Sequence, residues 1–467
     1  MNPLPARWIL LSLLLAAGCK DDSPSVIGGR KPDPKNEPAP AFLELPERPV
    51  PGRVFVVAID GASWEVFDDV LADGIMPRLA ELTRRGSKTE LTSMDPTASA
   101  ILWTTIATGK LPKKHGILGF VSTTPEGRVV PVSSTMRKVK ALWNIASEAG
   151  VSVGFLAWWV SWPAEPVRGF LATDYAWPLK KDRQGFATGS DVSIERERRT
   201  YPEELIRELD PFILTEARVA PAELARLGVA AVPRMQGYAV RDILLKDISI
   251  GQMTRHMLER KNGESLIATY FDGYDAFCHV FWPAYKQYSA ARGLGPEAIQ
   301  ALEPMVRALG QALDLHLARI DADLGFIMDQ AGPDDTVLVI SDHGFFDNPG
   351  GQPIERTYGD FIENQPFWHT RRGILAAMGG PIRKGASGVE ASILDITPTI
   401  LALLGLEVAE DMDGQVLTGL LTEQFLKDHP VDKIETYETG ERATSATESP
   451  YDEAMLERLR ELGYLGK

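Results

Sequence analysis

Five short runs of apolar residues recur along the chain, and none of them alternates with polar residues. They cover residues 54–59, 151–157, 265–270, 336–340 and 373–378. Continuous apolar runs of this length are typical of strands that are buried on both faces of a sheet. The runs therefore predict a central sheet that is covered on both sides.

Helical patterns lie between these runs, over residues 77–85, 100–108, 140–149, 305–330 and 393–404. Strands that alternate with helices predict an α/β fold with a mostly parallel central sheet flanked by helices. Residues 168–261 interrupt the alternation, because they mix acidic and basic positions and show no clear buried strand. We interpret residues 168–261 as an inserted cap region.

The amino terminus has the order of a secretory signal peptide over residues 1–18. Arg7 precedes an apolar run over 8–17, and small residues lead to Cys19. This run is shorter than the about 20 residues that a membrane-spanning helix needs. The cysteine resembles that of a bacterial lipobox, which implies cleavage before Cys19 and its lipidation; a plain signal peptide is the alternative. We expect an exported lipoprotein of the cell envelope, at the outer membrane or a periplasm-facing membrane.

A proline-rich stretch over residues 19–52 predicts an extended tether between this anchor and a folded domain. The folded domain is expected over 53–430. Residues 431–467 predict a polar tail followed by an amphipathic helix, whose apolar positions are Met455, Leu456, Leu459, Leu462 and Tyr464.

Charge and cysteine content exclude several classes of protein. The chain has 64 acidic and 49 basic residues and a net charge of −15, so a nucleic acid is not expected as a stable partner. Two cysteines cannot build a disulfide scaffold. A small phosphate-bearing substrate remains compatible with this charge, because a bound metal ion inverts the local field. Nothing in the sequence indicates an oligomeric state.

Carboxylates and imidazoles follow three of the predicted strands. Asp60 ends the first strand, and Asp342 and His343 end the fourth. Asp275 and His279 follow the third strand with the spacing of one helical turn, which places both on one helix face. Ligands of open parallel sheets bind outside the carboxyl ends of the strands. The sequence therefore predicts that these side chains converge at one edge of the sheet.

Together with His369, these residues resemble the alkaline phosphatase superfamily, in particular its type I phosphodiesterase/nucleotide pyrophosphatase branch. The resemblance is carried by Asp60-Gly61, PTASAILWTTIATGKLPKKHGI over 96–117, Asp275 with His279, Asp342-His343-Gly344, His369, and ILDITPTILALLGL over 393–406. It covers residues 54–417 and implies an alkaline-phosphatase-like core with two divalent metal ions.

By the same resemblance, one metal ion is bound by Asp275, His279 and His369. The other is bound by Asp60, Asp342 and His343. Mixed carboxylate and imidazole ligands suit Zn²⁺, although Mn²⁺ accepts similar ligands. Asp272 is an alternative to Asp275. Two ions about 3.5–4 Å apart clamp the attacking and leaving oxygens of a phosphoryl transfer.

The nucleophile that the resemblance implies is Ser99, ten residues before Gly109. Ser99 would attack phosphorus, form a phosphoserine intermediate and be released by hydrolysis. The alternative role for Ser99 is an ordinary helix N-cap, and Thr97 is the nearest competing hydroxyl. Lys110 is expected to be a solvated lysine, with a contact to substrate phosphate as the alternative.

One position departs from the pattern of the nucleotide pyrophosphatases, which typically carry an asparagine three residues after the nucleophile. Leu102 stands there in this chain. Hydrolysis of a phosphodiester or nucleotide pyrophosphate remains our first hypothesis. The alternatives are a phosphomonoesterase, a phosphonate hydrolase or a headgroup transferase of the same superfamily, and then a metal-bearing lipoprotein without turnover.

Overall fold

The structure is a computed structural model that describes residues 50–177, 198–233, 240–358, 360–440, 442–449, 452–461 and 463–465. The chain divides into two units, Met1–Ala41 and Phe42–Lys467, and only the second contains described residues. The predicted signal peptide, Cys19 and most of the tether lie outside the described residues. Within the described ranges, no helix is long and apolar enough to cross a membrane.

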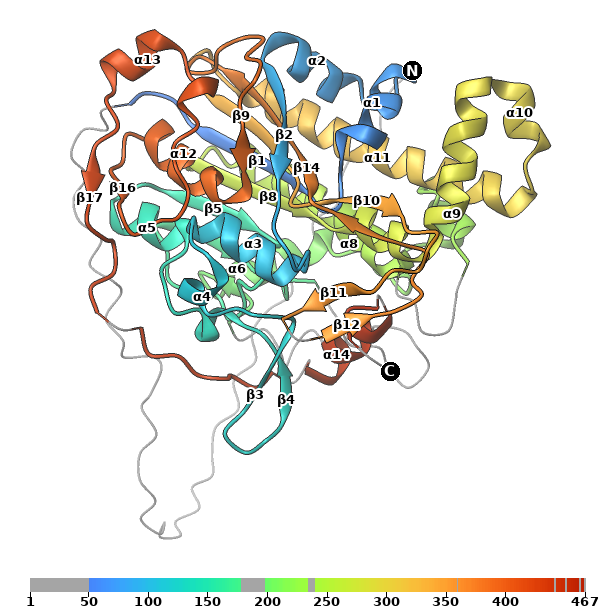
Figure 1. The fold of residues 1–467 in the computed structure, drawn as a ribbon, viewed down its shortest axis with the longest axis horizontal. Helices are drawn as coiled ribbons and strands as arrows, with labels where there is room; N and C mark the ends of the chain where they lie inside the picture. The colour runs from blue at the N-terminus through green and yellow to red at the C-terminus, as the bar shows by residue number, and fades with distance from the viewer. Residues whose placement is uncertain are drawn as a thin grey trace, which may run out of the picture. The chain divides into compact units, whose positions relative to one another are not determined.

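A nine-stranded sheet forms the centre of the second unit, with the strand order β15-β2-β14-β9-β1-β8-β5-β6-β7 (Figure 1). Its parallel part consists of β9 (Thr336–Ile340), β1 (Val54–Ile59), β8 (Leu266–Phe271), β5 (Val153–Leu156) and β6 (Gly169–Ala172). All residues of β1, β5, β8 and β9 are buried, as their continuous apolar sequences predict.

The remaining strands extend the sheet at both edges. They are β14 (Arg372–Gly379), β2 (Ser87–Thr92), β15 (Ala391–Ser392) and β7 (Thr200–Tyr201). β14 runs antiparallel to both β9 and β2, and β7 runs antiparallel to β6. The sheet is therefore mixed but mostly parallel, which confirms the predicted fold class.

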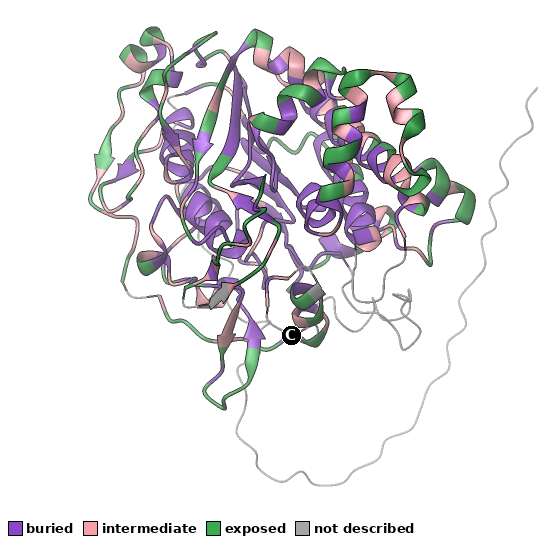
Figure 2. Cartoon of the chain, turned by 45° about the vertical axis from the view of Figure 1, so that its right-hand side comes forward, coloured by how far each residue is buried: buried purple, intermediate pink, exposed green. Residues whose placement is uncertain are grey.

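Helices cover both faces of the sheet, and its strands are buried between them (Figure 2). One group packs around α11 and comprises α2 (Pro77–Arg85), α8 (Val240–Glu259), α9 (Gly273–Leu294) and α11 (Pro304–Gln330). The other group comprises α3 (Ser99–Thr108), α5 (Leu142–Glu148) and α12 (Ile396–Leu403). The shorter helices are α1 (Trp64–Ala72), α4 (Pro112–His115), α6 (Leu205–Leu209), α7 (Pro221–Arg226), α10 (Pro296–Ala301), α13 (Glu423–Asp428) and α14 (Asp452–Glu461).

Outside the central sheet, the described residues also form smaller two-stranded ladders. These ladders pair β10 (Gly344–Asp347) with β13 (Phe367–Thr370), β11 (Ile354–Thr357) with β12 (Asp360–Ile362), β3 (Val121–Thr123) with β4 (Val129–Pro131), and β16 (Val408–Ala409) with β17 (Lys433–Ile434). α14 lies beside β4, near the ladder of β11 and β12 (Figure 1).

The expectation of no buried strand within residues 168–261 is wrong. β6 starts in this region and is the neighbour of β5 in the central sheet, and three of its four residues are buried. Its apolar run is only four residues long and begins with a glycine, so it gives a weak strand signal. α8, from the same region, packs against β8, α9 and α11. β6 and α8 therefore belong to the core of the fold.

The register of the sheet brings the predicted ligand positions together. Ile59 pairs with Phe271 across β1 and β8, and Ala58 pairs with Ile340 across β1 and β9. The residues that follow these three strands therefore leave the sheet side by side at its carboxyl edge.

Candidate metal centre and nucleophile

Asp60 leaves β1 through a turn that requires glycine at the next position. Gly61 has a φ of 77°, in the left-handed region that side-chain-bearing residues avoid. A Cβ at Gly61 would lie 3.2 Å from Asp275 Oδ1 and 3.0 Å from the ring of Phe345. Gly61 thus allows Asp60 and Asp275 to approach each other closely.

Asp275 and His279 lie on one face of α9, as their spacing predicts, because the helix begins at Gly273. Asp275 Oδ2 is 3.4 Å from His279 Nε2. His369 is delivered by the ladder of β10 and β13, where it pairs with Phe345. His369 Nε2 is 2.8 Å from His279 Nε2 and 3.3 Å from Asp275 Oδ1.

Asp60, Asp342 and His343 form the second group. Their ligand atoms lie within 4.8 Å of one another, and His343 Nε2 is 3.1 Å from Asp60 Oδ1. Ligand atoms of His343, Asp275 and His369 also lie within 4.8 Å of one another. His343 therefore lies between the group of Asp60 and the group of Asp275. All six predicted ligands are buried, with exposures between 0% and 8%. The structure thus brings all six together.

Several polar atoms of this centre have no hydrogen-bond partner among the residues described. They are Asp60 Oδ1, Asp275 Oδ1, both carboxylate oxygens of Asp342, and His343 Nε2. A buried polar atom without a partner costs free energy, and a cation between these atoms removes that cost. His369 Nδ1 is 2.7 Å from the carbonyl oxygen of Thr97, which directs the lone pair of Nε2 to the group. These donors fit divalent cations.

The carboxylates attract positive charge to this centre. Burial alone would lower the pKa of His343, but Asp342, Asp60 and Asp275 outweigh burial and raise it to about 10. Burial and the neighbouring Asp60 raise the pKa of Asp342 well above its usual range. Burial lowers the pKa of His279 to about 3, so this imidazole is neutral and its lone pair can bind a metal ion. The electrostatic field of the two Asp/His groups therefore favours the binding of a cation.

Ser99 is the first residue of α3 and is fully buried, and its hydroxyl adjoins the phenol of Tyr464. Trp103 lies one turn further along the same face and donates from Nε1 to Asp60 Oδ2 over 3.0 Å. This face of α3 is therefore turned toward the metal centre. Ala98, not Ser99, holds the N-cap position of α3, so the capping alternative for Ser99 is wrong.

Sequence reasoning missed two aromatic partners of Asp60. Besides the Trp103 indole, the hydroxyl of Tyr270 donates to Asp60 Oδ2. Both contacts leave Oδ1 of Asp60 free to bind a cation. Tyr270 lies within an apolar strand and Trp103 within a buried helix, so neither position carried a functional signal in the sequence.

A charged network holds the start of α9. Asp272 Oδ2 is 2.9 Å from Lys246 Nζ and 2.6 Å from Arg458 Nη2, so the alternative that Asp272 replaces Asp275 as a ligand is not supported. Asp247 accepts hydrogen bonds from the backbone N–H groups of residues 272 and 273 and lies 3.0 Å from His316 Nε2. These contacts orient the helix turn that carries Asp275.

The C-terminal segment reaches the same centre. Tyr464 donates from its hydroxyl to Asp275 Oδ2 over 2.6 Å and lies 3.0 Å from His279 Nε2. The sequence separation between Tyr464 and Asp275 is 189 residues, and nothing in the sequence indicated this contact. The amphipathic helix before it, α14, buries Met455 and Leu459, which its apolar period predicts.

A sequence model of the type I phosphodiesterase/nucleotide pyrophosphatase family matches residues 54–391 of the chain. The chain belongs to this family. It is a hydrolase of phosphate ester bonds, and its family depends on metal ions, for which the two Asp/His groups provide ligands. No curated protein matches the sequence.

Solved structures of this family and its superfamily resemble the chain at low sequence identity. Murine ectonucleotide pyrophosphatase/phosphodiesterase 5, in complex with AMP, is 13% identical over 80% of this chain and 100% of that chain, with a TM-score of 0.44. A putative sulfatase from Bacteroides thetaiotaomicron is 12% identical over 83% and 76%, with a TM-score of 0.45. Phosphonoacetate hydrolase from Sinorhizobium meliloti is 19% identical over 64% and 58%, with a TM-score of 0.35.

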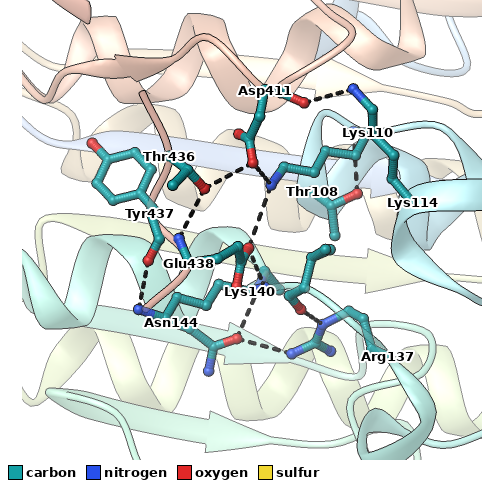
Figure 3. A network of polar contacts seen from close by, with 12 residues as sticks. Thr108, Lys110, Lys114, Arg137, Lys140, Asn144, Asp411, Thr436, Tyr437 and Glu438 are labelled. Carbon is teal, nitrogen blue, oxygen red and sulfur yellow. Dashed lines mark hydrogen bonds and ion pairs between the residues drawn. The ribbon is translucent and has the colours of Figure 1, made fainter. Parts of the chain in front are cut away.

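Lys110, which lies in the family block just after α3, is neither solvated nor directed at the metal centre. Its exposure is 2%, and its Nζ lies 2.7 Å from Asp411 Oδ2 and 3.4 Å from Glu438 Oε1 (Figure 3). Glu438 also accepts a hydrogen bond from the backbone N–H of Lys140. The prediction of a solvated Lys110 is wrong, because its ammonium group is buried against Asp411 and against Glu438 of the polar tail.

Proposed function

We propose that this chain hydrolyses a phosphodiester or a nucleotide pyrophosphate through a phosphoserine on Ser99, next to two bound divalent cations. The observation that carries the proposal is the pairing of two buried Asp/His groups with a fully buried serine on the helix face that also carries Trp103, a hydrogen-bond donor to Asp60. A site with ligands and nucleophile arranged in this way suits in-line phosphoryl transfer.

The ligands divide between two ions in this proposal. Asp275, His279 and His369 hold one ion, and Asp60, Asp342 and His343 hold the other. Zn²⁺ is the favoured metal, with Mn²⁺ as an alternative, because imidazole and carboxylate donors suit both. Such ions supply positive charge that stabilises the phosphoryl oxygens during transfer.

Ser99 provides the group that reacts. Its oxygen forms a bond to phosphorus while the bond from phosphorus to the leaving-group oxygen breaks, and water later hydrolyses the phosphoserine. Ser99 lies at the first turn of α3, whose free backbone N–H groups favour the negative charge of a phosphoryl group.

A second candidate function follows from Leu102. This side chain is fully buried in the main core, so α3 offers no amide to the substrate at this position. The candidates are a phosphomonoesterase, a phosphonate hydrolase or a headgroup transferase with the same ligands and nucleophile.

The test measures hydrolysis of p-nitrophenyl phosphate, p-nitrophenyl phenylphosphonate and p-nitrophenyl thymidine monophosphate, with and without EDTA. We expect the thymidine diester to be the best substrate, EDTA to abolish turnover, and added Zn²⁺ to restore it. Ser99→Ala should lower kcat by about a thousandfold or more, because it removes the nucleophile. Ser122→Ala in β3 is the matched control and should keep the wild-type rate.

Each other outcome points to a different function. A strict preference for the monoester or the phosphonate favours the second candidate. Two metal ions per chain with no turnover on any substrate favours a metal-bearing lipoprotein without catalysis and overturns the first proposal. Equal rates for Ser99→Ala and the wild type remove Ser99 from the mechanism.

We further propose that the enzyme is exported and anchored to a cell-envelope membrane through lipid on Cys19. The support is the order of charge, apolar run, small residues and cysteine at the amino terminus. Mass spectrometry of the mature N-terminal peptide tests this proposal. A free Cys19 thiol on an uncleaved chain would contradict it.

A further inference from the structure

The phenol of Tyr464 adjoins both the Ser99 hydroxyl and the ligand group of Asp275. Its hydroxyl is bonded to Asp275 Oδ2 and adjoins His279 Nε2, and the residue is 3% exposed. Tyr464 therefore presents an O–H donor beside the predicted nucleophile.

Several contacts fix the position of this phenol. Gly463 has a φ of 81°, which turns the chain back after α14, and the Tyr464 N–H donates to the carbonyl oxygen of Leu459 over 2.8 Å. Arg356 Nη1 donates to the Gly463 carbonyl over 2.9 Å. The ring of Tyr464 stacks on Phe120 with the centroids 4.3 Å apart. A side chain held from its backbone to its ring is pre-organised, as a substrate-contacting group needs to be.

Arg458 holds the preceding helix against the same centre. Its guanidinium bonds to Asp272, at the start of the helix that carries Asp275. Met455 and Leu459, on the same face of α14, pack in a cluster with Ala98 and Ala100, the neighbours of Ser99 in sequence. α14 is thus connected to both the ligand helix and the nucleophile helix.

Other donors near Ser99 are already engaged by carboxylates. Tyr270 and Trp103 donate to Asp60. Lys246 and Arg458 donate to Asp272. His279 Nε2 has a single lone pair, which the proposed metal ion would take, so it could no longer accept from Tyr464. Oδ1 of Asp275 is the oxygen left without a partner for the ion, and Asp275 Oδ2 and a charged phosphoryl oxygen then compete for the phenol hydrogen.

We propose that Tyr464 contacts the substrate by donating a hydrogen bond to a non-bridging oxygen of the phosphoryl group that Ser99 attacks. This inference rests on the proposed function. It makes the C-terminal segment a part of the substrate site. The substrate feature that Tyr464 recognises is a phosphoryl oxygen, which monoesters and diesters share, and not the leaving group.

The test compares zinc-loaded wild type, Tyr464→Phe and Tyr437→Phe. Calorimetry measures the binding of inorganic phosphate and of vanadate, and kinetics gives kcat and KM for the three p-nitrophenyl substrates. A hydrogen bond to a charged oxygen is worth about ten- to a hundredfold, so Tyr464→Phe should weaken phosphate and vanadate by that factor. It should also lower kcat/KM by a similar factor on every substrate that the wild type hydrolyses. Tyr437, whose hydroxyl donates to the Glu407 carbonyl away from the centre, is the matched control and should behave as wild type.

Metal content and zinc affinity separate a substrate contact from a ligand-orienting role. Tyr464→Phe should keep two metal ions per chain and bind zinc within about threefold of the wild type. A parallel loss of zinc affinity would overturn the inference and make Tyr464 a positioning residue for Asp275. Unchanged binding of phosphate and vanadate by Tyr464→Phe would also overturn the inference. Tighter binding would overturn it as well, because it would show that Tyr464 blocks the substrate site.

The same data separate this inference from the proposed function. If the zinc-loaded wild type neither hydrolyses a substrate nor binds phosphate, the proposed function fails. If the wild type does both and Tyr464→Phe equals it, only the inference about Tyr464 fails.

Discussion

The hydroxyl of Tyr270 is a single group whose removal should change metal binding without changing the fold. It donates to Asp60 Oδ2, while Oδ1 of the same carboxylate has no hydrogen-bond partner in the part of the chain that is described. Partners of this kind orient a ligand, and their loss typically costs about ten- to a hundredfold in metal affinity. We therefore expect Tyr270→Phe to bind zinc about tenfold more weakly.

A competition titration with a zinc-binding dye measures this change in affinity. Tyr437→Phe also loses one phenolic hydrogen bond, but away from the centre, and should keep the wild-type affinity. Equal zinc affinities for Tyr270→Phe and the wild type would contradict the role assigned to Tyr270.

Five of the six proposed ligands have a local signature in the sequence, whereas His369 was identified only through the family resemblance. Asp60, Asp342 and His343 follow apolar strands, and Asp275 and His279 have the spacing of a helix turn. The aromatic donors had no such signature. A tyrosine or tryptophan in an apolar run is predicted to be a core residue. Only the sheet register shows which carboxylate accepts a hydrogen bond from its polar atom.

Among the elements, α14 depends on tertiary contacts for its stability. It has ten residues, and isolated helices of this length are marginal in water. Arg458 bonds to the buried Asp272, which Lys246 also contacts. Arg458→Met keeps the long apolar stem and removes the charge, so it should loosen α14 while Lys246 still neutralises Asp272.

Hydrogen exchange of the 452–465 backbone amides measures the loosening. We expect exchange to be about ten- to a hundredfold faster in Arg458→Met than in the wild type, because breaking the buried ion pair costs about 1.5–3 kcal/mol. The matched control is Arg460→Met, on the exposed face of the same helix. Equal exchange in the two variants would show that apolar packing alone holds α14.

Some element boundaries followed from the sequence, whereas those of β5 and β8 are shifted by one or two residues from the predicted runs. The predicted bounds of β1, β9 and α2 agree with the structure at both ends. β6 was missed because four apolar residues after a glycine give little signal. The antiparallel direction of β14 was not predictable, because a strand buried on both faces shows the same pattern whichever way it runs.

At the scale of the whole molecule, the polar tail is tied to the core by buried ion pairs that no local pattern indicated. Arg442 of the tail and Arg137 both bond to Glu165. Arg137 also donates to Asn144 Oδ1 over 2.8 Å (Figure 3). Glu165 accepts a further hydrogen bond from Trp143 Nε1. Breaking such a group at one point leaves buried charges without partners.

Glu165 should make the stability of the whole chain depend on acid pH. Burial opposes its ionisation, but Arg137 and Arg442 outweigh burial and lower the pKa from 4.5 to about 2. A carboxylate with a lowered pKa stabilises the folded state above its unfolded pKa, and this stabilisation is lost as the pH falls toward the folded pKa. The difference corresponds to about 3 kcal/mol of unfolding free energy at neutral pH.

Glu165→Gln should therefore be less stable than the wild type by about 3 kcal/mol at pH 7, because the variant lacks the ionised partner of two arginines. The gap between the two proteins should be constant above about pH 5 and should shrink as the pH falls through 4.5 toward 2. Urea titrations between pH 7 and pH 3 measure it, with EDTA present so that metal release does not contribute. Glu148→Gln, which removes an exposed partner of Lys140, should cost much less and is the control. A gap that stays constant or widens between pH 5 and pH 3 would show that the Glu165 charge does not stabilise the fold, and that Glu165→Gln acts through packing alone.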